Sequence, residues 1–241
     1  MTDTQVPHSI NRIRVDREVV ERYPSFRLRV IYALGVSNSA SDDTSKAWLR
    51  AGAERAFARV GDAKLSEHPR IQAWRQAYGV FGAKPSAYPC SAESLARRVV
   101  KGGIDAVPVV NKLVDAYNAV SLAHLLPIGG EDLDKLSGEG RLRFVTAGDQ
   151  LPLAGEDGDL ADPPVPGEVV WADDLSWTCR RWNWRQGKRT RLTESTTNAY
   201  FVIEGMHAAD AADSVEAATA ELCALIQGSA NPARIEVVRV L

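Results

Sequence analysis

The order in which hydrophobic periodicity changes along the chain constrains its fold more than any other sequence feature. Apart from one early strand-like run, apolar residues recur at helical spacing as far as His124. After residue 134 the apolar residues occur in short runs typical of strands. One more helical pattern and a last strand-like run follow these strands. This segregation predicts an α+β fold, with a mixed or antiparallel sheet and packed helices, rather than alternating βαβ units.

Four helices are predicted before residue 125, and each has an apolar stripe. The first covers 46–60, and the second begins at Pro69, where proline suits the first turn. The third has Ser91 as its N-cap and ends at a pair of glycines, and the fourth covers about 109–124. The residues expected on the buried faces are Leu49, Ala53, Ala56, Phe57 and Val60, then Ile71, Trp74, Tyr78 and Phe81, then Leu95 and Val99, and then Val110, Leu113, Val114, Tyr117 and Val120.

The segment FRLRVIYALGV, which begins at Phe26, is predicted to be a strand. Arg27 and Arg29 alternate with apolar residues, so one face of this strand is expected to be solvated. Strands are also predicted in the runs LRFVTA, GEVVWAD, WTCRRWNW and NAYFVIE, and in the terminal run RIEVVRVL. Residues 213–226 predict a helix whose apolar face carries Val215, Leu222, Leu225 and Ile226.

Charge is balanced over the whole chain but not locally. The chain has 241 residues, 45% of them hydrophobic, and a net charge of −2, so neither disorder nor a nucleic-acid partner is indicated by composition. The segment 156–174 is mostly acidic, whereas 180–191 is basic. Both segments are compatible with solvated loops, and the basic one also with a nucleic-acid-binding face. The basic residues are Arg180, Arg181, Arg185, Lys188, Arg189 and Arg191.

No sequence signature indicates a metal, a cofactor or a membrane span. Cys90, Cys179 and Cys223 are far apart and form no CxxC pair, so a reducing cytoplasm is the expected location. The start, MTDTQVPHSI, lacks the apolar core of a signal peptide, and no apolar run approaches the roughly 18 residues of a membrane helix. Common nucleotide-binding and hydrolase motifs are missing. The four histidines, His8, His68, His124 and His207, do not have the spacing of metal ligands. His124 is expected at the C-terminus of its helix, where the helix dipole favours a histidine.

Three polar residues share one face of the fourth predicted helix. Asn111, Asp115 and Asn118 have i, i+4, i+7 spacing. The helix is otherwise apolar, and an unpaired buried polar group costs roughly 1–3 kcal/mol, so these side chains need partners. Two interpretations remain open from the spacing: the residues hold the adjacent loop in place, or they line a pocket.

A set of motifs occurs in a fixed order over the second half of the chain. The runs KGG, VPVVNKLVDAYNAVS, LPIG and DLDKL are followed by PGEVVWAD and RRWNWRQGKRTRLTESTTNAYFVIE. As a set, they resemble the B3/4 domain of bacterial phenylalanyl-tRNA synthetase β chains, and more closely its free-standing relatives. The resemblance covers roughly 84–204. It implies an α+β editing core over 84–241, with residues 1–83 as an N-terminal extension integrated with the fold.

The resemblance also implies an activity and a partner. It implies a trans-acting hydrolase that cleaves the ester between a wrong amino acid and its tRNA, without a cofactor or metal. In the synthetase, the domain removes tyrosine from phenylalanine tRNA. A free-standing branch, canavanyl-tRNA deacylase, removes the arginine mimic canavanine from arginine tRNA. A deacylase for another misacylated tRNA, a noncatalytic tRNA-binding module and a small-molecule enzyme on the same scaffold are the alternatives.

The stretch PIGGEDLD departs from the synthetase pattern. Gly129 replaces a histidine and Glu131 a phenylalanine, and the synthetase glutamate that recognises the tyrosine hydroxyl has no clear match. Glycine opens space, and a carboxylate binds a guanidinium-like head bidentately, so canavanine fits better than tyrosine. The alternative to substrate binding is that the acidic residues of this stretch cap a short helix after a turn or stay solvated. The expected substrate-binding residues are Asn111, Asp115, Tyr117, Ser121, Glu131, Asp132, Asn183 and Thr190.

Ester hydrolysis needs an attacking water and stabilisation of the oxyanion, and a metal is not obligatory. No serine or cysteine has a neighbouring base by motif, so no covalent intermediate is expected. The expected catalytic elements are Asn118 and the backbone amides of Gly129 and Gly130, which would position the water.

The run RRWNWRQGKRT is compatible with a strand that has Trp182 and Trp184 on one side. At least one of these tryptophans is expected to pack in the core. Aromatic side chains between arginines also suit stacking on a terminal nucleoside and contacts to phosphates. The expected tRNA-binding residues are Lys84, Arg181, Trp184, Arg185, Lys188 and Arg189.

Overall fold

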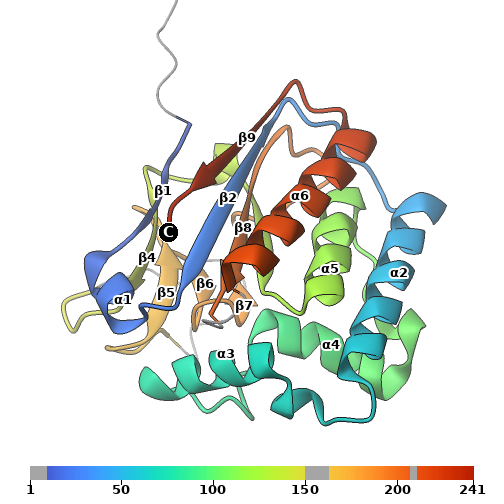
Figure 1. Ribbon diagram of the computed structural model, residues 1–241. Coiled ribbons are helices and arrows are strands. Elements are labelled where there is room, and N and C mark those ends of the chain that lie inside the picture. The colour runs from blue at the N-terminus through green and yellow to red at the C-terminus, as the bar shows by residue number, and fades with distance from the viewer. Residues whose placement is uncertain (1–9, 150–162, 207–210) are drawn as a thin grey trace, which may run out of the picture.

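The computed structural model describes residues 10–149, 163–206 and 211–241. Within these ranges, two β-sheets and a set of helices form a layered structure, which confirms the predicted α+β fold (Figure 1). His8, His207 and the first part of the acidic segment 156–174 lie outside the described residues.

A four-stranded antiparallel sheet, called the central sheet below, forms the middle layer. Its strand order is β3 (Ile128–Asp132), β8 (Asn198–Gly205), β2 (Arg27–Leu34) and β9 (Arg234–Arg239). Successive side chains of a strand point to opposite faces, so Leu28 and Val30 belong to one hydrophobic core and Ile31 and Ala33 to another. The central sheet is therefore buried on both faces.

A second sheet packs beside the central sheet and completes one of the two cores. Its strand order is β1 (Ile13–Val15), β4 (Gly140–Phe144), β5 (Val169–Ala172), β6 (Trp177–Arg180) and β7 (Arg185–Gln186). Strands β1 and β4 are parallel and the other neighbours are antiparallel, so this sheet is mixed. Strands β1 and β2 of the N-terminal segment thus pair with later strands in both sheets.

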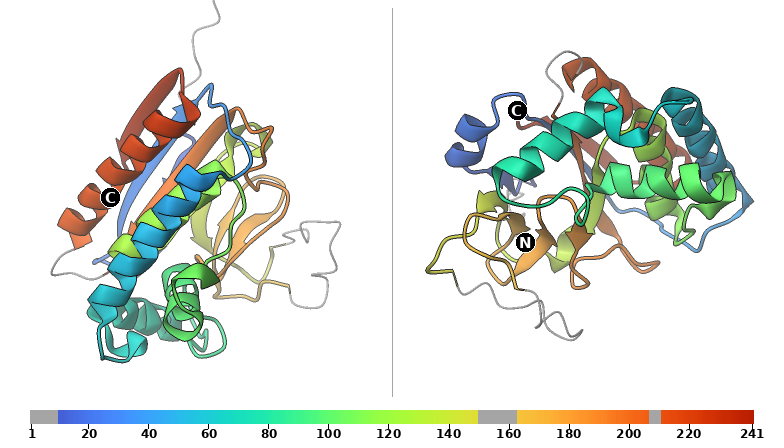
Figure 2. Two further views of the ribbon diagram at one scale, coloured as in Figure 1. Left: turned by 90° about the vertical axis from the view of Figure 1, so that its right-hand side faces the viewer. Right: turned by 90° about the horizontal axis from the view of Figure 1, so that it is seen from below.

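The helices cover one face and one end of this sheet pair. Helices α5 and α6 lie on one face of the central sheet, and α2 packs against the outer side of α5 (Figure 1). Helices α3 and α4 lie across the lower end of the molecule (Figure 2). The bounds of the α-helices are α1 (Arg17–Arg22), α2 (Asp43–Val60), α3 (Pro69–Val80), α4 (Ser91–Gly102), α5 (Lys112–His124) and α6 (Ala211–Ala230), and those of the short 3-10 helices are η1 (Leu65–Glu67), η2 (Ile104–Ala106) and η3 (Leu133–Lys135).

Local capping chemistry explains where several helices begin. Helix α2 starts with a capping box, in which the Asp42 carboxylate accepts a hydrogen bond from the Ser45 backbone N–H and the Ser45 hydroxyl accepts one from the Asp42 backbone N–H. Helix α3 starts at Pro69, as predicted. Helix α4 starts one residue earlier than predicted, with Cys90 as the N-cap in place of Ser91.

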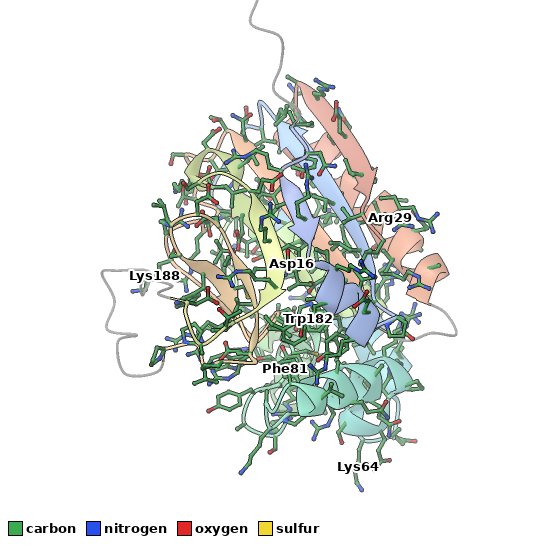
Figure 3. The ribbon with its side chains drawn as sticks, turned by 90° about the vertical axis from the view of Figure 1, so that its left-hand side faces the viewer. Asp16, Arg29, Lys64, Phe81, Trp182 and Lys188 are labelled. Atoms are coloured by element: carbon green, nitrogen blue, oxygen red, sulfur yellow. The ribbon has the colours of Figure 1, made fainter. Side chains whose placement is uncertain are left out.

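The prediction that β2 has a solvated face is wrong. Arg29 is only 2% exposed, because the sheet is covered on both sides. Its guanidinium pairs with Glu216 of α6 and donates to the Leu241 carbonyl, and Figure 3 shows it beside that helix. The prediction that Phe57 is buried is also wrong, because this side chain is 55% exposed.

The stretch PIGGEDLD forms a strand and not the turn expected from its glycines. Residues Ile128–Asp132 are β3, whose backbone pairs with β8. The acids after the glycines divide between two roles. Glu131 belongs to the strand, whereas Asp132 caps the 3-10 helix η3 by accepting a hydrogen bond from the Asp134 backbone. The alternative of a short helix after this segment is thus confirmed for Asp132 alone.

We expect Gly52→Ala to destabilise the fold, although alanine is the better helix former. A Cβ at position 52 of α2 would collide with the backbone carbonyl of Ala119 in α5. Overpacking of this kind costs about 1–3 kcal/mol, which exceeds the gain of about 1 kcal/mol in helix propensity. Urea unfolding measures the difference. The matched control is Gly228→Ala in α6, where a Cβ meets nothing within 4 Å, and this change should stabilise. Equal effects of the two changes would contradict this close helix contact.

Candidate functional site

A cavity of about 170 Å³, called the inner cavity below, lies between the two sheets and the middle of α5. Strands β3 and β8 form its floor, β5 to β7 and the adjoining turn form one wall, and Tyr117 and Asn118 of α5 contribute to another. Pockets for drug-sized ligands usually exceed about 300 Å³, so this one has the size for a single amino-acid side chain.

Strand geometry decides which residues of β3 and β8 reach the inner cavity. Gly129 and Glu131 of β3 line it, as do Tyr200 and Glu204 of β8. These positions alternate along each strand, so their side chains share one face. Gly130 lies on the opposite face, where an added Cβ would meet Phe201 and Leu192. Of the two glycines expected in catalysis, the structure therefore brings only Gly129 to the cavity.

The Glu131 carboxylate is buried in the cavity floor. It is 7% exposed and accepts a hydrogen bond from the Tyr200 hydroxyl. Burial raises the pKa of Glu131, and the nearby polar groups of Tyr200, Thr190 and Thr178 counter part of that rise. Gln186, also beside this carboxylate, donates to the Gly130 carbonyl at 2.9 Å and so holds β7 against β3.

Glu204 is a second buried carboxylate in the same cavity, and sequence reasoning did not identify it. It is 1% exposed, and its Oε1 accepts hydrogen bonds from the indoles of Trp171 at 3.2 Å and Trp182 at 3.0 Å. Its Oε2 accepts from the Asn183 amide at 2.8 Å. Burial raises the pKa of Glu204 to about 7, against the lowering effect of these three donors.

Neither carboxylate has a cationic partner in the part of the chain that the structure describes. Among the residues that the structure describes, no lysine or arginine forms an ion pair with Glu131 or Glu204. Burial also raises the pKa of Tyr117, and the charge of Glu131 adds to that effect. The inner cavity is therefore an enclosed site with an excess of negative charge when both acids are ionised.

The turn at 181–184 carries two residues into a left-handed backbone conformation. Arg181 has φ 45° and Trp182 has φ 65°, values that are uncommon for residues other than glycine. The predicted strand with both tryptophans on one side is therefore wrong here. This conformation directs the Trp182 indole to Glu204, and such strain is frequent at functional sites.

Trp182 also confirms the expectation that at least one of these tryptophans packs in the core. It is fully buried, and its ring makes edge contacts with Tyr23, Phe26 and Trp74 at centroid distances of 4.9, 5.0 and 5.2 Å. Figure 3 shows Trp182 in the interior above Phe81. The donor to Glu204 is thus held by an aromatic cluster that limits its movement.

Trp184 forms a second aromatic group at the cavity wall. Its ring meets Tyr88 edge-on at 5.0 Å, and the Arg181 guanidinium lies 3.8 Å from the Tyr88 centroid and 4.7 Å from that of Trp184. Arg181 is buried, so its contacts are internal. This cation–π arrangement fixes the wall of the cavity.

The predicted substrate and catalytic residues divide into two groups. Asn111, the N-cap of α5, accepts a hydrogen bond from the Val114 backbone, and Asp115 accepts one from Ser45 at 2.8 Å. These two residues hold the start of the helix, which agrees with the structural interpretation of their spacing. Ser121, Asp132 and Thr190 likewise lie outside the inner cavity. Those that line it are Tyr117, Asn118, Gly129, Glu131 and Asn183, and Trp184, which was predicted to bind tRNA, lines it as well.

The predicted tRNA-binding residues differ in exposure. Lys84, Arg185 and Lys188 are exposed, and Figure 3 shows Lys188 at the periphery of the molecule. Arg189 forms an ion pair with Asp173 at 2.6 Å and donates to the Lys135 carbonyl, so it links β5 to η3. A role for these residues in tRNA binding stays a prediction.

Two further properties of the described residues bear on the site. No group of three or more His, Cys, Asp and Glu side chains in this part of the chain could hold a metal ion. No helix within the same ranges is long and apolar enough to cross a membrane.

The described residues form an α+β domain with an acidic cavity between its two sheets. The family model of the B3/4 domain matches residues 73–225, which is more than half of the chain, and the protein therefore belongs to the B3/4 domain family. B3/4 domains occur in the phenylalanyl-tRNA synthetase β chain and in related tRNA-binding modules. A comparison with curated proteins finds no match.

We expect the stability of the protein to fall as the pH rises through about 7, and Glu204→Gln to remove part of this dependence. A carboxyl whose folded pKa is raised from 4.5 to about 7 favours the folded state below pH 4.5, and this contribution is lost as the group ionises. The loss amounts to about 3 kcal/mol. Urea unfolding at several pH values between 4.5 and 8.5 measures it. The exposed Glu194→Gln should leave the pH profile unchanged, and an unchanged profile in Glu204→Gln would contradict the assignment.

Proposed function

We propose that the protein is a trans-acting hydrolase that removes a cationic amino acid, canavanine in particular, from mischarged arginine tRNA. The observation that carries this proposal is the pair of buried carboxylates, Glu131 and Glu204, in a cavity of amino-acid size, where no described lysine or arginine forms an ion pair with either of them. Membership of the B3/4 family supports the tRNA context of this activity.

Electrostatics favours a cationic head group in the inner cavity. Burial has raised the pKa of both acids, so ionising them in the empty cavity is unfavourable. A guanidinium-type cation removes that penalty and can donate several hydrogen bonds in one plane. The phenol of tyrosine has one donor and no charge, so it would leave at least one carboxylate uncompensated.

The aromatic walls suit the same head group. Trp182, Trp184 and Tyr200 line the cavity. A planar cation gains from contact with aromatic faces in a desolvated site. Gly129 places no side chain over the cavity floor, where an added Cβ would make an ordinary contact with Val202 at 3.6 Å. Shape and charge therefore point to the same class of amino acid.

The reaction is the attack of water on the aminoacyl ester. The ester is intrinsically reactive, so the protein has to position it and stabilise the oxyanion of the tetrahedral intermediate. Asn118 of α5 lines the inner cavity and has an amide that forms no hydrogen bond with any described residue. We assign it the positioning of the carbonyl or the water, and the exposed Lys84, Arg185 and Lys188 the binding of tRNA phosphates.

The deciding experiment compares canavanyl-, arginyl-, lysyl-, tyrosyl- and phenylalanyl-tRNA as substrates under single-turnover conditions. We expect rapid loss of the canavanyl ester and slow loss of the tyrosyl and phenylalanyl esters. Glu131→Gln should lower kcat/KM for canavanyl-tRNA by about 30- to 150-fold, because the lost charged hydrogen bond is worth about 2–3 kcal/mol. The matched control, the exposed Glu194→Gln, should behave as wild type.

Other outcomes of this experiment would contradict the proposal in different ways. Hydrolysis of none of the esters, with tRNA binding retained, would indicate a noncatalytic module. Preferred hydrolysis of the tyrosyl ester would overturn the choice of a cationic substrate. Full activity of Glu131→Gln on canavanyl-tRNA would remove Glu131 from head-group recognition.

We also expect the affinity for a free cationic head group to rise with pH. Agmatine is a suitable probe, because its guanidinium keeps its charge throughout pH 6–8. A cation that prefers ionised Glu204 must displace its proton, so binding strengthens by about tenfold between pH 6 and pH 8 for a pKa near 7. Calorimetric titration in two buffers measures both the affinity and the released protons. A pH-independent affinity would contradict contact between the cation and this carboxylate.

A further inference from the structure

A second cavity, called the outer cavity, adjoins the inner one. It has a volume of about 180 Å³ and shares four lining residues with the inner cavity: Ser91, Asn118, Ile128 and Trp184. These four residues lie between the two chambers and are called the neck below. A ligand that occupied both chambers would pass its middle part across the neck, beside Ser91 of α4 and Asn118 of α5.

The two chambers differ in charge. The inner one holds Glu131 and Glu204, whereas the charged residue that lines the outer one is Arg98 of α4. Arg98 is exposed and forms no hydrogen bond or ion pair with the described residues. A ligand with a cationic end and an anionic end matches this arrangement. In an aminoacyl-tRNA, the ester lies between the amino-acid side chain and the phosphate backbone, and so falls at the neck.

The neck carries a hydroxyl that the fold itself does not use. Ser91 Oγ is buried from solvent and forms no hydrogen bond within the described residues. Leaving a buried hydroxyl unpaired costs roughly 1–3 kcal/mol, and at the neck a bound ligand can supply the missing partner. Asn118, across the neck, is half-buried and has an amide that forms no hydrogen bond with the described residues.

We propose that Ser91 is a further catalytic residue, which donates its hydroxyl hydrogen bond to the carbonyl oxygen of the ester at the neck. Ser91 is the first residue of α4, where the helix dipole adds positive potential for a developing oxyanion. It acts as a donor and not as a nucleophile, because none of the described histidines lines either chamber to accept its proton. This inference rests on the proposed hydrolysis of an aminoacyl ester.

The chemical step balances with water as the only co-reactant. The oxygen of water bonds to the carbonyl carbon, and Ser91 and Asn118 donate hydrogen bonds to the carbonyl oxygen as it becomes negative. The bond between the carbonyl carbon and the ribose oxygen then breaks. The ribose oxygen takes one proton that originates from water, and the second proton leaves to solvent as the new carboxylic acid ionises.

Ser91→Ala tests this assignment in single-turnover deacylation of canavanyl-tRNA. We expect kcat and kcat/KM to fall together by about 100-fold, because one oxyanion donor is lost and it acts mainly in the transition state. Ser91→Thr, which keeps a hydroxyl, should restore part of the rate. The affinity for agmatine, which probes the inner chamber, should stay within twofold of wild type.

The chain offers a closely matched control. Ser41 also has a buried hydroxyl without a hydrogen-bond partner, and it lines neither chamber. Ser41→Ala should therefore retain the wild-type rate, and neither alanine variant should have a lower thermal midpoint than wild type, because each removes an unpaired buried hydroxyl. A rate within twofold of wild type in Ser91→Ala would overturn the role of Ser91 while leaving the proposed function intact. If wild type hydrolyses no ester at all, the proposed function fails first, and the inference fails with it.

Discussion

The burial of two carboxylates on one face of the central sheet is the interaction on which the rest of the structure depends. Each buried carboxyl loses hydration that only specific donors can replace. Tyr200 supplies one for Glu131, and two indoles with the Asn183 amide supply three for Glu204. These donors come from β5, β8 and the turn at 181–184, so the second sheet must close over the central sheet for the site to exist. The surrounding aromatic cluster then holds the donors in position.

The aromatic cluster around Trp182 explains why the backbone departs from regular strand structure at the turn 181–184. The Glu204 carboxylate and the core around Trp74 both lie within reach of Trp182, and a regular continuation of β6 would not direct its ring to both. Left-handed conformations at Arg181 and Trp182 cost of order 1–3 kcal/mol each. Full burial of the Trp182 ring and its hydrogen bond to the carboxylate offset that cost. A strained turn and a buried acid thus stabilise each other.

Much of the fold could be predicted from the sequence, and part of the site could not. The helix beginning at Pro69 and the terminal strand follow from local signals such as proline placement and short apolar runs. Glu131 stood out because it follows two glycines in a polar stretch. Glu204 ends an apolar strand and looks like a boundary residue, and its burial depends on Trp171 and Trp182, which lie 33 and 22 positions away. Arg29 was predicted to be exposed and is buried, and the sequence could not show this because its partners Glu216 and Leu241 are distant along the chain.

Under the proposed function, the two acids also explain how one scaffold could change the amino acid that it accepts. An aromatic side chain at position 131 would fill the cavity floor, and a carboxylate there adds a charge that is unfavourable until a cation enters. Selectivity then arises because a cation compensates the buried negative charge, whereas a neutral ligand of the same size leaves it uncompensated. Discrimination between two cations must come from elsewhere, because both satisfy the charge. The rigid aromatic walls and the narrow neck between α4 and α5 are the features that can sense a difference in length or geometry, and they act where the ester must be positioned for attack.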